Sequence, residues 1–258
     1  MKLSMNLLNC VLATIWLFFA NAEATRFQQL IEQVKQMLDD HKDAEIPGVI
    51  GMSRSLRQED MGLVNNYGCW CYFEENHGNG KGSPTDEIDQ FCKYLHDGYQ
   101  CIIMEMESIY NSSCVPWVIP YNSAYGGGYT PFGFTLENLR EECVQLNPNM
   151  VCESLTCMVE GLFVQSFFSY AIFGGQINHQ YRHTLDDGSL NFDPNDGSCP
   201  TVDVPLGRND LECCGEYPIR YPFHNRSNSR QCCGTLTYNP FMQSCCDEEA
   251  SEINFSCA

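Results

Sequence analysis

A histidine and a glutamate stand on two helix-forming segments at spacings that could bring them together. His96 follows Cys92 by four residues and Glu160 follows Cys157 by three, so each shares a helix face with its cysteine. Two such helices packed antiparallel would place Glu160 beside His96. A carboxylate on one imidazole nitrogen fixes the tautomer and lets the other nitrogen act as a base toward water. The sequence therefore predicts His96 and Glu160 as a catalytic pair, rather than a surface histidine and a solvent-facing glutamate.

Asp97, directly after the histidine, is the candidate metal ligand. Calcium prefers oxygen ligands, and Asp97 with loop carbonyls could hold such an ion. A calcium there would polarise an ester carbonyl and stabilise its oxyanion. The chemistry that these residues predict is ester hydrolysis.

The surrounding segments predict the elements that position these side chains. Residues 67–82 are rich in Gly and Asn and predict a loop. Ser83 as the cap, Pro84 at the first helical position and Asp86 three residues after the cap predict the start of a helix. Its inner stripe is Ile88, Cys92, Leu95 and Tyr99.

Other helices and loops follow from hydrophobic spacing. A second long helix is predicted from about Leu136 or Glu142, through a break at Pro148, to about Phe173. Its apolar run could also span a membrane, but its length and internal charge argue against a transmembrane span. Residues 26–41 predict an earlier helix: a propeptide, a lipid-surface contact or, by default, a packed N-terminal helix. Residues 115–134 predict a loop or small hairpin, and 175–198 a linker.

The N-terminus and the cysteines predict a secreted protein. A short charged start, an apolar run from Leu7 to Phe19 and a small-residue site ending at Ala22 predict a signal peptide over residues 1–22. Of 17 cysteines, Cys10 leaves with it, and 16 remain for disulfides, with zinc binding as the alternative. They form two sets of eight, which predicts two separately cross-linked units. Three glycosylation sequons fit the same compartment: Asn111, Asn225 and Asn254.

Charge limits the partners. Without Lys2, 13 basic residues face 33 acidic ones, a formal charge of −20. Nucleic acid is excluded as a partner on this ground. Calcium, mineral surfaces and basic partners remain compatible with such a surface.

The tail, residues 195–258, is predicted to be a separate cysteine-rich module of irregular or β structure. It carries three adjacent cysteine pairs: Cys213-Cys214, Cys232-Cys233 and Cys245-Cys246. A unit this small with few large apolar groups needs such cross-links to fold. The pairs are similar to cysteine-pair modules on extracellular and skeletal-matrix proteins of invertebrates, including galaxin-like ones. That resemblance implies display or assembly outside the cell, with matrix proteins as partners.

About 35 residues of the chain resemble the secreted phospholipase A2 family. The family pattern is Tyr-Gly-Cys-x-Cys, a glycine-rich calcium loop, Pro-x-Asp-x-x-Asp, a cysteine-bearing helix and His-Asp. The chain carries these in order, as Tyr67-Gly68-Cys69-Trp70-Cys71, the glycines Gly80 and Gly82, Pro84 to Asp89, Cys92 and His96-Asp97. The resemblance implies a small, mainly α, disulfide-rich phospholipase A2-like domain over residues 61–180, after an N-terminal helix or propeptide over 23–60.

A second match lies downstream. In the family, a later helix carries Cys-x-x-x-x-Cys-x-Cys-Asp, whose Asp hydrogen-bonds the catalytic histidine; Cys152, Cys157, Val159 and Glu160 take these places. The resemblance implies the disulfides Cys71–Cys92, Cys143–Cys157 and Cys114–Cys152. It leaves Cys69 and Cys101 to pair with each other or with the tail.

Two family disulfides are missing as whole pairs. The family joins a cysteine three residues after the histidine to the one before the Asp, and these places hold Tyr99 and Val159. It also joins a cysteine of the first helix to one six after the Asp, here Phe91 (or nearby) and Ser166. Paired loss is expected when bridges are dropped within a retained fold.

The calcium ligands that the resemblance implies are Asp97 and carbonyls of Trp70, Tyr72 and Gly80. The loop is about five residues longer than in the family, because residues 72–77 precede the glycines. Two alternatives exist for Glu74, Glu75 and His77 in this loop: they are additional calcium ligands, or they are solvated side chains. Cys92 lies four residues before His96, where the family's nearest cysteine lies three before.

Two functions therefore compete. The first is a secreted, calcium-dependent hydrolase that cleaves the sn-2 ester of phospholipids at a lipid interface. The second is a catalytically inactive relative that serves as an extracellular matrix or binding protein; a toxin-like ligand is a third. The acidic charge and the tail favour the second, whereas retention of His96, Asp97 and Glu160 favours the first.

Overall fold

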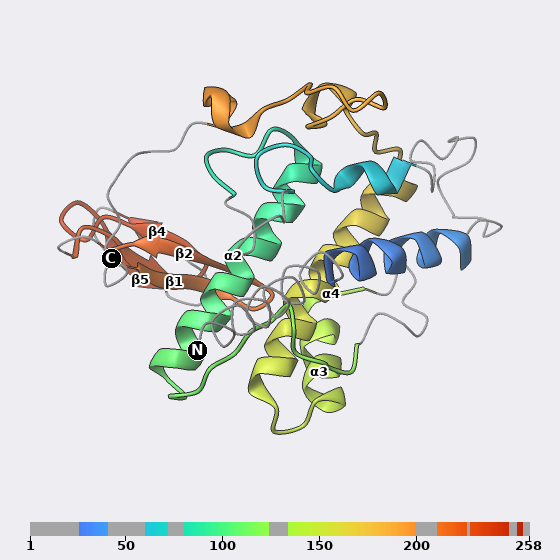
Figure 1. The fold of residues 1–258 in the computed structure, drawn as a ribbon. Helices are drawn as coiled ribbons and strands as arrows, with labels where there is room; N and C mark the ends of the chain where they lie inside the picture. Colours follow the sequence, from blue (N-terminus) through green and yellow to red (C-terminus); the bar gives the residue numbers. More distant parts are fainter. Residues whose placement is uncertain are drawn as a thin grey trace, which may run out of the picture.

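Two helices of 22 residues each form the centre of the protein, α2 (Glu87–Ser108) and α4 (Val151–Ile172). The shorter α3 (Leu136–Leu146) packs on α4, and the first of three β-hairpins packs against α2 (Figure 1). The structure is a computed structural model and describes residues 26–40, 60–71, 80–123, 134–199, 211–225, 228–247 and 252–254. The predicted signal peptide lies outside these residues. About half helical and rich in disulfides, the chain has the mainly α class expected from its sequence.

The core forms around α4 because that helix is apolar on almost every side. Phe163, Phe167 and Phe168 are buried, and 72% of its most apolar window lies inside the protein. A helix that is hydrophobic all round belongs in a protein core or in a membrane. The burial favours the core, although α4 is long and apolar enough to cross a bilayer.

α2 and α4 approach closely at a glycine. A Cβ placed on Gly98 would stand 2.6 Å from Cγ1 of Val159, well inside van der Waals contact. Gly98 therefore lets the two helix backbones come together. The contact also fixes which face of α2 looks toward α4.

The start of α2 differs from the prediction. The helix begins at Glu87, and Asp86 is its cap, because the Asp86 side chain accepts a hydrogen bond from the amide of Asp89. Ser83 and Pro84 lie in the preceding loop. The break predicted at Pro148 is confirmed, since α3 ends at Leu146 and α4 begins at Val151.

Residues 26–40 form a helix, shown in blue in Figure 1. Its apolar face is part of the main core: Phe27, Leu30, Ile31, Val34, Met37 and Leu38 are all buried. Of the three readings of this segment, the structure describes a packed helix. A short 3-10 turn, η1 (Asp60–Val64), leads into the loop around Tyr67.

The tail contains three antiparallel hairpins. They pair β1 (Leu211–Glu216) with β2 (Ile219–His224), β3 (Gln231–Cys233) with β4 (Leu236–Tyr238), and β5 (Ser244–Asp247) with β6 (Glu252–Asn254). The first hairpin docks on α2, where Glu105 pairs with Arg220 and accepts a hydrogen bond from the Tyr217 hydroxyl. Predicted β structure in the tail is confirmed.

Two disulfides join the tail segment to the helical body, so the prediction of two separately cross-linked units is wrong. Cys69 pairs with Cys199 and Cys101 with Cys213. Cysteine counts along a chain give no information on which distant partners fold together. The cross-links and the Glu105 contacts tie the predicted domains 61–180 and 195–258 to each other.

The segment predicted as a linker is also packed. It contains η2 (His179–Tyr181) and η3 (Pro194–Ser198), and it lies along the Tyr67 loop. The buried His183 bonds through Nε2 to the carbonyl oxygen of Gly68 at 2.8 Å. Polar composition indicated a linker, but these polar groups satisfy the backbone of the neighbouring loop.

Seven disulfides join described residues, and they include the three that the resemblance implies: Cys71–Cys92, Cys114–Cys152 and Cys143–Cys157. So many disulfides are typical of extracellular proteins. Of the sequons, Asn111 is exposed, and Asn225 is half-buried with its amide donating to Glu212. Asn254 lies in β6.

Candidate functional site

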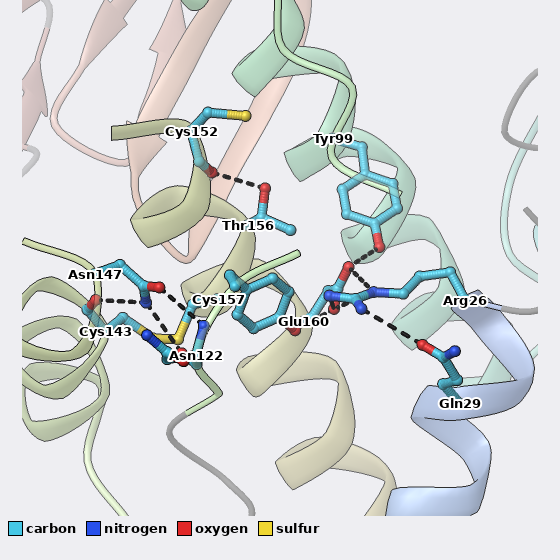
Figure 2. A network of polar contacts seen from close by, with 11 residues as sticks. Arg26, Gln29, Tyr99, Asn122, Cys143, Asn147, Cys152, Thr156, Cys157 and Glu160 are labelled. Carbon is cyan, nitrogen blue, oxygen red and sulfur yellow. Dashed lines mark hydrogen bonds and ion pairs between the residues drawn. A yellow bond between two sulfur atoms is a disulfide. The ribbon is translucent and has the colours of Figure 1, made fainter. Parts of the chain in front are cut away.

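Glu160 is the centre of a buried polar network. It lies on α4 with no exposed surface. Arg26 donates from Nε to both carboxylate oxygens at 3.0 Å and pairs from Nη2 at 2.8 Å. The hydroxyls of Tyr99 and Tyr121 also donate to the carboxylate. Figure 2 shows Arg26 from the N-terminal helix and Tyr99 from α2 converging on this side chain.

The network keeps a charge in the protein interior. Burial raises the pKa of Glu160, and the Arg26 guanidinium and the two tyrosine hydroxyls act against that rise. An arginine stays protonated, so the pair holds its two charges together. The guanidinium also stacks 4.4 Å from the ring centre of Tyr121. The interactions that satisfy Glu160 therefore come from three separate parts of the chain.

His96 points toward the loop of Trp70. Its Nε2 lies 2.9 Å from the carbonyl oxygen of Trp70, and its ring centre is 5.8 Å from the indole. Because a carbonyl only accepts, Nε2 carries the hydrogen and the lone pair is on Nδ1. Burial lowers the pKa of His96 to about 4, the Trp70 carbonyl acts against this, and Lys93 adds to it. The imidazole is thus neutral at physiological pH.

Helix geometry explains the direction of His96. Residues two apart on an α-helix point about 200° apart. Gly98 faces Val159 of α4, so His96 lies on the far side of α2 from that contact. Leu95, three residues before Gly98, lies on the nearer side. Tyr99 instead of His96 reaches the Glu160 carboxylate.

The residue that lies opposite Val159 differs from the one that the resemblance implied. The sequence assigned Tyr99 to that place, but Gly98 occupies it. The shift is one residue, which equals about 100° around a helix. Phe91 and Ser166, the other assigned pair, both border one surface pocket.

Asp97 is paired with a lysine of its own helix. The Lys93 ammonium contacts the Asp97 carboxylate, and the same ammonium lies 4.9 Å from the ring centre of Trp70. The Asp97 side chain is 7% exposed, so its carboxylate is largely shielded from water. Burial raises the pKa of Asp97, and Lys93 opposes the rise.

The residues described around Asp97 do not fit a calcium ion. The Trp70 carbonyl takes the His96 hydrogen, and the Asp97 carboxylate takes the Lys93 ammonium. Gly80 packs on the Trp70 ring, and Tyr72 lies outside the described residues. Within the described part of the chain, no three His, Cys, Asp or Glu side chains gather where they could hold a metal. A cation binding there would have to displace two donors of the protein itself.

Asp89 organises the loop that carries Trp70. Its buried carboxylate accepts hydrogen bonds from the amides of Cys69, Trp70 and Cys71 at 2.9, 2.7 and 3.2 Å. The amide of Thr85 donates to it at 2.9 Å. The loop is thus held from inside by one carboxylate.

Sequence reasoning missed several members of this region. Arg26, Tyr121, Lys93 and Asp89 were given no functional role. Lys93 and Asp97 are four apart on a predicted helix, which is a detectable ion-pair spacing. The contact of Arg26 with Glu160 spans 134 residues, and no local pattern signals it.

The lowered pKa of His96 predicts a pH-dependent stability. Between pH 4 and 6.5 the unfolded chain binds more protons at this histidine than the folded one, so stability falls as the pH falls through that window. The loss is about 3 kcal/mol at the acid end. It is measured by guanidinium unfolding of the wild type and of His96→Gln, whose amide can also donate to Trp70.

Burial also raises the pKa of Asp89, Asp97 and Glu160, which adds to the pH dependence of both proteins, so the test is the difference between the two. The wild-type advantage should shrink from pH 6.5 to pH 4. A difference that stays constant across this range would show that His96 does not become harder to protonate on folding.

Comparisons of the chain with protein-family models, curated proteins and solved structures find no match. A function for the chain must therefore be argued from its own residues and their geometry.

Proposed function

We propose that the chain is an extracellular, phospholipase A2-like protein that does not hydrolyse phospholipids and acts as a calcium-independent binding protein. The observation that carries the proposal is the separation of the two predicted catalytic groups. Nε2 of His96 bonds to the Trp70 carbonyl, whereas the Glu160 carboxylate takes its hydrogen bonds from Arg26, Tyr99 and Tyr121.

The phospholipase-like part of the proposal is supported by the disulfides. All three pairings that the resemblance implies are present, and Glu160 is buried on the helix where the resemblance implies an acid. Where the family has a disulfide between these two helices, Gly98 of α2 and Val159 of α4 pack closely against each other.

The loss of catalysis is supported by the helix register. Counted three residues on from Cys92, the family's histidine position falls on Leu95. Counted three residues back from Gly98, which faces Val159, it falls on Leu95 again. Leu95 is buried and has no group that could activate water. On this count His96 takes the family's metal-ligand position, and its Nε2–H donates to the Trp70 carbonyl.

The hydrolase predicted from the sequence and the binding protein proposed here differ in one assay. Mature protein is incubated with phosphatidylcholine and phosphatidylglycerol vesicles, with calcium and with chelator, beside an active calcium-dependent secreted phospholipase A2 and the His96→Gln variant. We expect no fatty acid release above the blank from either form of this chain, because His96 bonds to the Trp70 carbonyl and the Glu160 carboxylate is occupied by Arg26 and two tyrosine hydroxyls.

A calcium titration by calorimetry complements the assay. We expect no binding heat at millimolar calcium, because Lys93 neutralises Asp97. Release that requires calcium and disappears in His96→Gln would establish the hydrolase and overturn the proposal.

A further inference from the structure

A pocket of about 690 Å³ lies between the start of α2 and the end of α4. Aromatic side chains border it from both helices, among them Phe91 on α2 and Tyr170 on α4. Its volume is in the range of sites that bind small molecules. None of its lining residues belongs to the Glu160 network.

A residue that lines this pocket has a buried amide without partners. Gln165 on α4 is 2% exposed and borders the pocket, yet neither its Nε2 nor its Oε1 has a hydrogen-bond partner. Buried polar groups in folded proteins are almost always paired. Asn147, another buried amide, has partners for both its oxygen and its nitrogen (Figure 2). Among the described side chains with unpaired buried polar atoms, Gln165 is the one amide that lacks both partners.

The aromatic wall beside Gln165 is fixed in place. The Tyr170 hydroxyl donates to the carbonyl of Gln176 at 3.0 Å and accepts from the Gln176 amide at 3.2 Å. The ring of Tyr170 packs edge-on against Phe91, with centres 5.9 Å apart. The chain after α4 thus folds back on Tyr170 and holds a preformed apolar surface next to an unsatisfied amide.

The amide selects the ligand. A carboxamide presents one acceptor and two donors in one plane, so a ligand that satisfies it needs a donor beside an acceptor. A hydrocarbon has neither, and an ester has the acceptor alone. A carboxylate also lacks the donor, and the exposed Glu87 at the pocket and the net charge of −19 disfavour anions.

We propose that this pocket binds a small, neutral aromatic molecule that carries a carboxamide or lactam group. The ring lies against Phe91 and Tyr170. The Gln165 amide, whose two polar atoms have almost no exposed surface, turns into the pocket and forms two parallel hydrogen bonds with the amide of the ligand. This proposal rests on the binding role proposed above and names its ligand. It would hold even if the chain hydrolysed phospholipids, because neither His96 nor Glu160 lines the pocket. The vesicle assay and a ligand titration can therefore fail separately.

Benzamide is the probe, with methyl benzoate and benzoate as analogues of the same shape that lack the donor or carry a charge. Binding to the mature protein is followed by NMR titration. We expect benzamide to bind at least about tenfold more tightly than either analogue, the ratio that one hydrogen bond supplies. Equal binding of benzamide and methyl benzoate, or no binding of benzamide, would overturn the proposal.

Two variants locate the binding. Gln165→Leu should weaken benzamide about tenfold and leave methyl benzoate unchanged, while its unfolding midpoint stays level or rises because an unsatisfied polar group is removed. Ser166→Phe, which places a ring in the pocket from its wall, should weaken both. If Gln165→Leu folds and binds benzamide as the wild type does, Gln165 is not the recognition group and the proposal fails.

Discussion

An Arg26→Met variant is expected to lose about 3–5 kcal/mol of unfolding free energy at pH 7, the cost of leaving one member of a buried ion pair alone. Glu160 has no exposed surface, and Arg26 supplies its only cationic partner among the described contacts. Guanidinium unfolding with the disulfides intact measures the loss. The deficit should narrow as the pH falls, because an unpaired buried Glu160 accepts a proton and sheds its charge.

Two controls separate the ion pair from other effects of the substitution. Lys35→Met changes a cation on the same helix whose pair with Glu32 is exposed, and it should cost at most about 0.5 kcal/mol. The double variant Arg26→Met and Glu160→Leu should recover much of the lost stability, since apolar replacement of a whole buried pair is often neutral. An Arg26→Met loss no larger than that of Lys35→Met would contradict the role given to this pair.

This ion pair bears on the fate of the N-terminal segment. Cleavage that removed residues 23–60 would take away Arg26 together with the buried face of the helix over residues 26–40. The core would lose apolar cover, and Glu160 would lose its countercharge. Both losses argue that the helix over residues 26–40 stays in the mature protein. Its removal as a propeptide would expose part of the core and leave Glu160 without its countercharge.

The parts of the fold that the sequence predicted are those set by local rules. The apolar run of α4, its break from α3 near Pro148 and the burial of Glu160 among apolar neighbours follow from local composition. The cap of α2 was assigned to the wrong residue because Ser83 and Asp86 are both good caps. Asp86 has that role because its carboxylate meets the amide of Asp89.

The relation between His96 and Glu160 shows where sequence reasoning ends. The spacing indicated that His96 shares a helix face with Cys92, and Glu160 with Cys157. Residues on one face can still point in directions that differ by tens of degrees. One residue of register moves a side chain by about 100°, enough to exchange Leu95 for His96. The contact of Gly98 with Val159 resolves that register, and it depends on how two distant segments pack.

Sequence reasoning left the docking of the tail open, because it allowed Cys69 and Cys101 to pair either with each other or with the tail; the structure has the second arrangement. Glu105 and Arg220 are 115 residues apart, and Cys101 and Cys213 are 112 apart. From the sequence, each of these residues could equally have formed its ion pair or disulfide with a partner in its own segment. Only the packing of the first hairpin on α2 brings them into contact.

An Asp89→Ala variant is the second substitution with a large expected effect, and it acts on the loop instead of the core. It removes the acceptor of the amides of Cys69, Trp70, Cys71 and Thr85. Each buried amide left unpaired costs about 1–3 kcal/mol, and water entering the loop recovers part of this, so we expect a loss of about 3–5 kcal/mol. Asp89→Asn, whose one carbonyl oxygen can still accept, should lose less.

The loop should open locally rather than detach, because disulfides hold Cys69 to Cys199 and Cys71 to Cys92. Hydrogen exchange at the amides of residues 69–71 should therefore accelerate more than exchange in α4. Asp186→Ala is the matched control, since that carboxylate is 90% exposed; it should change stability by at most about 0.5 kcal/mol. Unchanged exchange at these amides in Asp89→Ala would mean that the disulfides alone shape the loop. Accelerated exchange would mean that a single buried carboxylate positions the Trp70 carbonyl, and through it the ring of His96.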